Sequence, residues 1–377
     1  MSAGETSSPS RPQWHGHAGE ACAQLHVDLD ALGENWRTAD RLSGTAACAA
    51  VVKGNAYGTG IERAVPALLH AGARTFFAAT IGEARRVRTA CGPDIPIYVL
   101  NGLLPGTAGA FIKCDLRPVL GTLEEVAEWR EAGGGLAALH VDTGMNRFGL
   151  SLQDAQAVAA QGGLDLSLVM THMACADEPG HAVNARQIAT FEDVRLLFPG
   201  MPASLCNSAS VAWLGIGGDY DLSRPGIALY GGEPINGHDN PFRPVVELVA
   251  PVLSVRDVAA GDIVGYGATW TAQRDTRIAT IGLGYADGFH RVASAGDGES
   301  AYAVQIDGQR APLAGRVNMD LLTVDVTDIA DVSRGTPVTV IGGAIPLSET
   351  AQHFRTNVYE VLTSLGARYH RRYMEAS

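Results

Sequence analysis

Short apolar runs alternate with longer amphipathic segments from about residue 46 to residue 232, and this alternation constrains the fold more than any other feature of the sequence. The short runs are ACAAVV, TFFAATI, IPIYVL, LRPVL, LAALHV, LSLVMTH, ASLC and GIALYG. Between them lie IERAVPALLHAG, GEARRVRTAC, TLEEVAEWREAG, LQDAQAVAAQGG and ARQIATFEDVRLLF, where apolar residues recur at three- and four-residue steps. Near-continuous apolar strands separated by helices indicate a parallel sheet that is covered on its faces.

The eight short runs predict eight strands, in a unit that recurs about every 20 to 30 residues. This count favours a (β/α)8 barrel of the TIM type over an open, doubly wound sheet. No GxGxxG motif follows the first run, which weakens the dinucleotide-binding alternative.

The pattern changes after about residue 245, where VVELVAPVLSVRDV, RIATIGLGY, LLTVDVTDI and TPVTVIGG are separated by frequent turn residues. These segments are typical of a mostly β domain, and VYEVLTSLGARYHRRY predicts one closing helix. We therefore expect a disordered leader over residues 1–20, a barrel over 21–245 and a smaller β-rich domain over 246–377. The leader is polar and lacks the apolar core of a signal peptide.

Composition excludes several classes of function. The net charge of −12 disfavours nucleic acid and anionic membrane as partners, because both require a clustered basic surface. The six cysteines include no CxxC pair, so the sequence predicts neither a disulfide framework nor a metal site, and fits a reducing cytoplasm. No segment has the composition of a membrane span.

Polar residues follow several of the predicted strands. Barrel enzymes carry their reactive groups at the carboxyl ends of the strands, so side chains in these positions meet at one rim. Taken singly, each has a plain structural explanation, such as a solvated lysine or an ion-paired arginine. Their shared placement predicts a site formed by Lys53, Arg147, His172, Asn207, Ser208, Arg224 and Gly226.

The same segments resemble those of alanine racemases, a family of pyridoxal-phosphate enzymes with a fold type III barrel. The resemblance runs through HVDLDALGENWR, AVVKGNAYGTG, HVDTGMNRFGL, THMACADE, CNSAS, SRPGIALYG, GYGATW, GLGYADGF, GRVNMDLLTVDVTD and NVYEVLTSLGARYHRRY, in the family's order and spacing. It implies a cytoplasmic isomerase that interconverts L- and D-alanine, and leaves open whether the enzyme supplies D-alanine for cell walls or serves its breakdown.

The resemblance also implies how the cofactor is bound. Lys53 matches the lysine that binds pyridoxal phosphate covalently, a role that suits a nucleophilic amine. Arg224 matches the residue that faces the pyridine nitrogen, and an arginine there donates a hydrogen bond and leaves that nitrogen unprotonated. The remaining cofactor-binding positions implied by the family are Tyr57, Arg147, His172, Asn207, Ser208, Gly226, Ile227 and Tyr359.

Racemisation requires a base on each side of the α-carbon. By resemblance, Lys53 acts on the D-enantiomer, and Tyr266 of a partner subunit acts on the L-enantiomer. The family pattern therefore implies a homodimer with composite sites. It places Arg147, Met319 and Asp320 at the substrate and Tyr285, Arg291 and Asp177 along the entry channel.

The sequence departs from the family pattern at two positions. His140 stands where many members have a lysine that becomes carbamylated, and a histidine forms no such stable carbamate. Asn318 replaces a small or thiol residue beside the substrate pocket, which puts strict alanine preference in doubt.

Other functions fit less well. A racemase of broad specificity remains an alternative. A pocket discriminates one methylene group by only about 1–3 kcal/mol, which the match of motifs does not resolve. Arg224 argues against a decarboxylase of basic amino acids, and Tyr266 with Met319 argues against a simple cofactor carrier. An aspartic protease needs a second catalytic aspartate motif, whereas the DTG of residues 142–144 stands alone.

Overall fold

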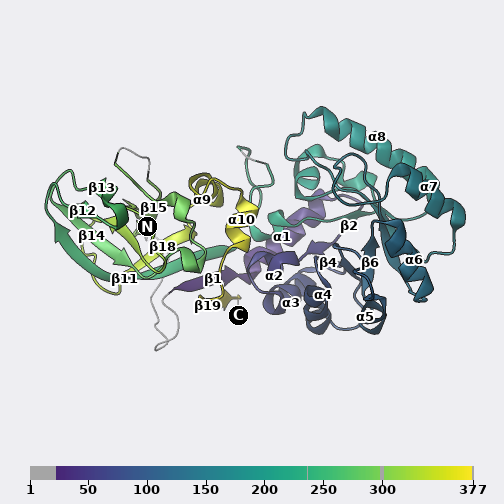
Figure 1. Ribbon diagram of the computed structural model, residues 1–377, viewed down its shortest axis with the longest axis horizontal. Coiled ribbons are helices and arrows are strands. Elements are labelled where there is room, and N and C mark those ends of the chain that lie inside the picture. The colour runs from purple at the N-terminus through teal and green to yellow at the C-terminus, as the bar shows by residue number, and fades with distance from the viewer. Residues whose placement is uncertain (1–22, 236, 298–300, 376–377) are drawn as a thin grey trace, which may run out of the picture. The chain divides into compact units, whose positions relative to one another are not determined.

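The computed structural model describes residues 23–235, 237–297 and 301–375, which form two compact units (Figure 1). One unit comprises Asp28–Val245 and the chain end from Tyr373. The other comprises Val246–Arg372 and, of the beginning of the chain, the described residues 23–27. The leader predicted over residues 1–20 lies outside the described residues.

Parallel strands form the centre of the first unit, as the sequence predicts. The order along the sheet follows the order along the chain, from β3 to β9, and every neighbouring pair is parallel. The strands are β2 (Ala47–Cys48), β3 (Ala50–Val51), β4 (Phe76–Ala78), β5 (Ile97–Val99), β6 (Arg117–Leu120), β7 (Ala137–His140), β8 (Leu166–Met170), β9 (Ala203–Ser204) and β10 (Leu222–Ser223).

The eighth strand is not the one predicted from GIALYG. Residues Ile227–Tyr230 form a 3-10 turn, and β10 takes the eighth place instead. The β10 strand pairs in parallel with β2, and the amide of Arg224 donates to the carbonyl of Cys206 after β9. These contacts close the barrel. Pro225 has no amide hydrogen for a sheet, so the chain turns directly after β10.

Helices cover the outside of these strands (Figure 1). In α3, the buried residues Ile61, Ala64, Val65 and Leu68 follow the helical repeat and face the strands. Threonine or serine side chains cap α4, α6 and α7 at their first turns. The helices are α1 (Leu29–Leu42), α2 (Lys53–Tyr57), α3 (Ile61–Ala71), α4 (Ile81–Cys91), α5 (Ala108–Lys113), α6 (Leu123–Glu131), α7 (Leu152–Gln161) and α8 (Ala182–Leu197).

The second unit is mostly antiparallel sheet. The long strand β11 pairs with β1 and β18 along its first half and with β14 along its second half. The elements are β1 (Gln24–Asp28), β11 (Val246–Val258), β12 (Ile263–Val264), β13 (Trp270–Thr271), β14 (Thr276–Ile281), β15 (Ala303–Ile306), β16 (Gln309–Pro312), β17 (Leu322–Asp325), β18 (Pro337–Gly342), β19 (His370–Met374), α9 (Leu347–His353) and α10 (Val358–Thr363). The strand β1 thus belongs to this sheet, although residues from 21 onward were expected in the barrel.

The predicted closing helix is wrong in its second half. The helix α10 ends at Thr363, and β19 follows as a strand beside β1. Gly366 separates the two, and its amide donates to the carbonyl of Asp287. A glycine interrupts a helix at an entropic cost, and this tertiary contact fixes the break.

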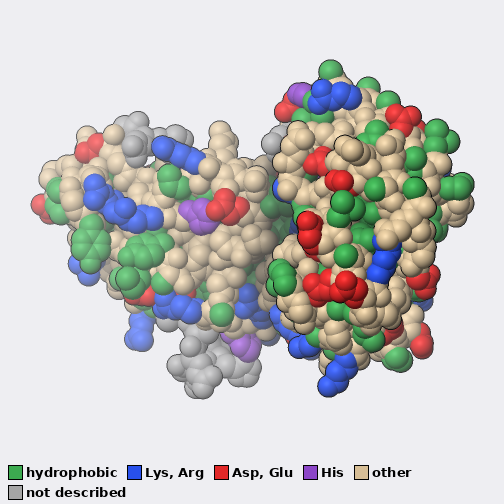
Figure 2. Space-filling view, turned by 45° about the vertical axis from the view of Figure 1, so that its right-hand side comes forward, with side chains coloured by type: hydrophobic (Ala, Val, Ile, Leu, Met, Phe, Trp, Pro, Cys, Tyr) green, Lys and Arg blue, Asp and Glu red, His purple; other side chains and the backbone are tan. Residues whose placement is uncertain are grey.

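The surface of the barrel unit is mixed in character. Acidic and basic side chains stand among hydrophobic ones on the face that Figure 2 shows. Among the described residues, no helix has both the length and the apolar character that crossing a membrane requires.

Candidate active site at the carboxyl ends of the barrel strands

Lys53 comes directly after β3 and opens an unusual turn. Residues 54–58 all have positive φ, and Asn55, Ala56 and Tyr57 form a left-handed helical turn with φ of 55°, 53° and 50°. Such a turn is costly for residues other than glycine. It carries the chain from the end of β3 to the start of α3 and places Lys53 and Tyr57 at its two ends.

The amine of Lys53 is tuned by its surroundings. The residue is exposed as a whole, and its amine nevertheless lies among protein atoms that displace part of its hydration. This desolvation, followed by the positive charge of Arg147, lowers the pKa of Lys53, while the negative charge of Glu83 acts in the opposite direction. A lowered pKa increases the fraction of neutral amine, which is the nucleophilic form.

Arg224 is a buried cation whose positive charge also acts on the amine of Lys53. One of its terminal nitrogens donates to the carbonyl of Thr171 at 2.6 Å, and the other donates to the hydroxyl of Ser204. Desolvation lowers the pKa of Arg224 to about 10, so the guanidinium stays protonated at neutral pH. The sequence analysis assigned no role to Thr171 or Ser204, because their bonds to Arg224 join segments that are far apart in the sequence.

Two histidines lie in the same field of positive charge. Burial and then the charge of Arg224 lower the pKa of His140 to about 4 and move the pKa of His172 in the same direction. Both imidazoles are therefore neutral at pH 7. The ring of His140 packs edge-on against Phe148, with the ring centres 5.8 Å apart.

A polar cradle forms where the last two strands of the barrel end. The hydroxyl of Ser208 accepts hydrogen bonds from the amides of Gly226 at 2.9 Å and Ala228 at 3.3 Å. Tyr57 packs so closely on Gly226 that a Cβ there would lie 2.3 Å from the Tyr57 hydroxyl oxygen. On its other side, Tyr57 stacks on Tyr230, with the ring centres 4.5 Å apart. Tyr230 is a third residue of the site, after Thr171 and Ser204, to which the sequence analysis assigned no role.

The other barrel residues of the predicted set differ in their surroundings. Arg147 is exposed, and the carboxylate of Asp142 fixes its loop by accepting from the Arg147 amide at 3.1 Å. The side chain of Asn207 accepts from Ser210 and so caps the following turn. Asp177 is exposed in the loop after β8. The buried Ile227 begins the 3-10 turn of the cradle.

The remaining predicted residues belong to the β-rich unit. Tyr266 is 72% exposed and Met319 is 53% exposed. The amides of Tyr285 and Ala286 donate to the carbonyls of Asn318 and Met319, so the predicted channel and substrate segments lie together. The other predicted residues of this unit, also exposed at least in part, are Asp320, Arg291 and Tyr359.

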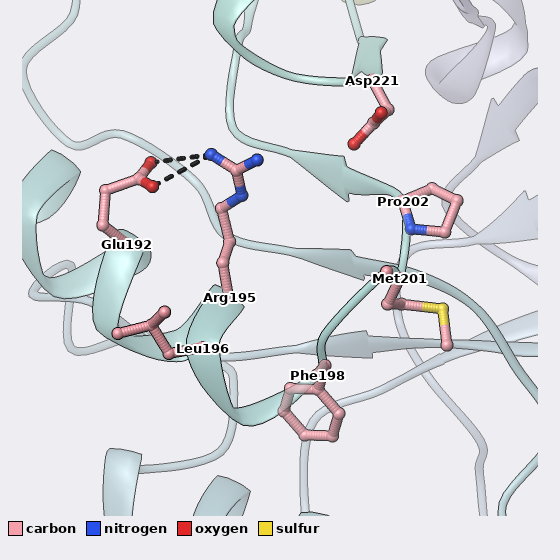
Figure 3. A pocket seen from close by; sticks show the side chains of 8 residues that line it. Glu192, Arg195, Leu196, Phe198, Met201, Pro202 and Asp221 are labelled. Carbon is pink, nitrogen blue, oxygen red and sulfur yellow. Dashed lines mark hydrogen bonds and ion pairs between the residues drawn. The ribbon is translucent and has the colours of Figure 1, made fainter.

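A separate pocket lies near α8 and contains none of the predicted site residues. Its lining includes the ion pair of Glu192 with Arg195, the apolar Phe198 and Met201, and Asp221 (Figure 3). Asp221 is occupied as an acceptor for the amide of Ala203. Among the described residues, no cluster of three or more histidine, cysteine, aspartate or glutamate side chains could hold a metal ion.

Comparison with known proteins agrees with the resemblance seen in the sequence. Residues 27–234 match the family model described as alanine racemase, N-terminal domain, and residues 245–373 match alanine racemase, C-terminal domain. A curated alanine racemase from Methylobacterium nodulans is 47% identical over 365 residues, which cover 94% of this chain and 97% of that protein.

Solved structures show the same similarity in three dimensions. Alanine racemase from Bartonella henselae, with covalently bound pyridoxal phosphate, superposes with a TM-score of 0.87 at 33% identity and covers 94% of this chain and 100% of that one. The biosynthetic alanine racemase from Pseudomonas aeruginosa gives a TM-score of 0.87 at 35% identity, with the same coverage. The predicted class, a barrel followed by a mostly β domain, is thereby confirmed.

Proposed function

Because the chain belongs to the alanine racemase family, we propose that it interconverts L-alanine and D-alanine with pyridoxal phosphate as its cofactor. The observation that carries this proposal is the setting of Lys53. Its amine stands at a strand end with a lowered pKa, beside the buried cation Arg224. This setting favours covalent attachment of an aldehyde.

The residues of the barrel unit fit pyridoxal phosphate. The cradle of Ser208, Gly226 and Ile227 offers a hydroxyl and a backbone turn without room for a Cβ, which suits phosphate oxygens that approach the main chain. Tyr57 adds a hydroxyl at the same place. We assign Tyr359, His172 and Asn207 to cofactor binding as well, by their match to the family pattern.

Arg224 controls the chemistry of the ring. A guanidinium is a hydrogen-bond donor only, so Arg224 keeps its proton and offers a donor to the pyridine nitrogen. Thr171 and Ser204 fix the orientation of this donor. When bound, the cofactor supplies an electron-withdrawing ring that acidifies the α-proton of the substrate.

Two bases move the α-proton. Lys53 takes it from D-alanine or returns it on that side, and Tyr266 of the partner subunit does so on the other side. Arg147, Met319 and Asp320 orient the substrate carboxylate, and Tyr285, Arg291 and Asp177 line its path. Tyr266 and Met319 are exposed in the single chain. This exposure supports a dimer in which a second copy covers them and completes a site that excludes water.

The experiment incubates the purified full-length protein with the enantiomers of alanine, serine, lysine and arginine and follows optical rotation. Racemisation of alanine supports the proposal. Comparable turnover of the larger substrates would indicate a racemase of broad specificity. Asn318, which precedes Met319 at the predicted substrate pocket, is the reason to test this alternative.

Sedimentation measures whether the protein is a monomer or a dimer. A fully active monomer would contradict the composite site. We propose that the enzyme acts in the cytoplasm, because its cysteines form no CxxC pair and fit a reducing compartment.

A further inference from the structure

The turn that follows Lys53 needs support from outside. Asn55, Ala56 and Tyr57 all adopt left-handed backbone, and such strain persists only where surrounding structure holds it. The carbonyls of Asn55 and Ala56 accept from the amides of Gly60 and Thr59 within the same segment. The amide of Ala56 donates to the carbonyl of Val52, and that of Gly58 donates to the carbonyl of Gly54, each at 2.9 Å. The amide of Asn55 donates to no carbonyl of this segment and bonds instead to a side chain of α4.

The partner of that amide is Glu83 on α4. One carboxylate oxygen of Glu83 accepts from the amide of Asn55 at 3.0 Å, and the other accepts from the amide of Ala79 at 3.0 Å. Bonds from amides to an ionised carboxylate are among the stronger hydrogen bonds. The carboxylate thus links the turn after β3 to the end of β4.

Arg86, one helical turn further along α4, holds the side chain of Asn55. Its guanidinium donates to the Asn55 side-chain oxygen at 2.6 Å and pairs with Glu62 through two bonds. Main chain and side chain of Asn55 are therefore both fixed by α4.

We propose that Glu83 is a positioning residue that holds the left-handed turn and thereby aims Lys53 and Tyr57 at the cofactor. This inference rests on the proposed function, because it concerns the residues that bind pyridoxal phosphate. Lys53 lies two residues before Asn55, and Tyr57 lies two residues after it. A shift of the turn moves both residues, and with Tyr57 it moves the contact with Gly226.

A second glutamate of the barrel, Glu125, also accepts hydrogen bonds from loop amides near the start of its helix. The loops that Glu125 holds contain none of the predicted site residues. Glu125 occupies the third position of α6, as Glu83 does in α4, and each follows a capping threonine in the sequences TIGE and TLEE. Glu125 accepts from the amides of Leu103 at 2.7 Å and Gly121 at 2.7 Å. Glu125 therefore provides a matched control for the loss of such a carboxylate.

The charge of Glu83 gives a second readout. The charged groups that act on the Lys53 amine are Arg147 and Arg224, which lower its pKa, and Glu83, which raises it. Without the negative charge of Glu83, the positive charges of Arg147 and Arg224 lower the pKa of Lys53 further. The pH profile for covalent capture of pyridoxal phosphate by the apoenzyme then moves to lower pH.

The test compares Glu83→Gln with Glu125→Gln in the full chain. For Glu83→Gln we expect weaker capture of pyridoxal phosphate by the apoenzyme, a capture profile shifted to lower pH, and kcat reduced roughly 100-fold with less change in KM, because small misplacement of a reacting group is costly. Glu125→Gln should lower the melting temperature and leave the capture profile and kcat close to those of the wild type. Equal effects of the two variants on capture and kcat would overturn the proposal.

If Glu83→Gln does not fold, a second substitution in the same chain still tests the proposal. Adding Ala56→Gly supplies a residue that adopts φ of 53° without strain. Recovery of folding and capture supports the proposal, and no recovery contradicts it. A wild-type protein that captures pyridoxal phosphate without racemising alanine would refute the proposed function, whereas the comparison of Glu83 with Glu125 in capture would still decide this inference.

Discussion

The barrel unit holds several of its site residues in its interior, whereas the β-rich unit exposes its site residues at least in part. In the barrel, Arg224 and Ser208 are buried, and each is fixed by hydrogen bonds within the same unit. In the β-rich unit, Tyr266 and Met319 are largely exposed. The barrel thus holds most of the proposed cofactor-binding residues, whereas the β-rich unit presents exposed side chains that, in the proposed function, complete the site of a partner subunit. Variants in the two units should therefore fail in different ways.

The largest expected effect is in the barrel, at Lys53. The sequence contains two lysines, Lys53 and Lys113, so few amines can hold an aldehyde. Lys53→Ala should abolish the visible absorbance of the covalently bound cofactor and reduce racemisation by about 10²–10⁴-fold or more, because both a nucleophile and a base are lost. Lys113→Ala, at the end of α5, is the control and should keep both. Retained turnover in Lys53→Ala would refute the mechanism.

The β-rich unit is tested at Tyr266, where the cofactor should still bind. Since L- and D-alanine are equal in free energy, both directions of racemisation must lose kcat/KM equally in Tyr266→Phe, by about 10²–10⁴-fold. Which base acts on which enantiomer is measured instead by the exchange of the α-hydrogen of each enantiomer for deuterium in D2O. D-alanine should exchange through Lys53 and remain D, whereas exchange from L-alanine should fall with racemisation. Equal loss of exchange from both enantiomers would contradict the assignment of the two bases.

A smaller effect is expected at Gly226, where the barrel cradle is closely packed. In Gly226→Ala the new Cβ meets the hydroxyl of Tyr57, and overpacking of this kind costs about 1–3 kcal/mol. We expect the affinity of the apoenzyme for pyridoxal phosphate to fall roughly 10- to 100-fold, as measured by titration of absorbance. Gly109→Ala has open space for its Cβ and should leave that affinity unchanged. An unaltered affinity in Gly226→Ala would place the phosphate elsewhere.

The contrast between the units also explains what the sequence could predict. Strands and helices of the barrel follow from their apolar periods, and the rim residues Lys53 and Arg224 follow because parallel strands end at one rim. The strand β10 was missed because it has two residues and no apolar run. The closing helix was overextended because the contact of Gly366 with Asp287 is tertiary.

Contacts between distant segments account for the rest of the site. Glu83 bonds to a backbone amide 28 residues away, and Arg224 bonds to a carbonyl 53 residues away. Such bonds produce no recognisable pattern in the sequence, because the backbone of any loop has amides and carbonyls. The capping sequence TIGE signals a helix that begins after Thr80, with Glu83 as its third residue. Only the fold reveals that the carboxylate of Glu83 also reaches the turn after Lys53.

The last expected effect concerns the pH dependence of stability in the barrel unit and leaves activity at neutral pH aside. The pKa of His140 is about 4 in the folded chain and about 6.5 in an unfolded one. Between these values the unfolded chain binds more protons, so stability falls as pH falls from 6.5 toward 4, by about 3 kcal/mol at pH 4. His140→Gln removes this contribution, and urea unfolding of the apoenzyme between pH 4.5 and 7.5 should give a shallower pH dependence than in the wild type. Parallel curves for the two proteins would show that His140 is not held neutral by burial and by the charge of Arg224.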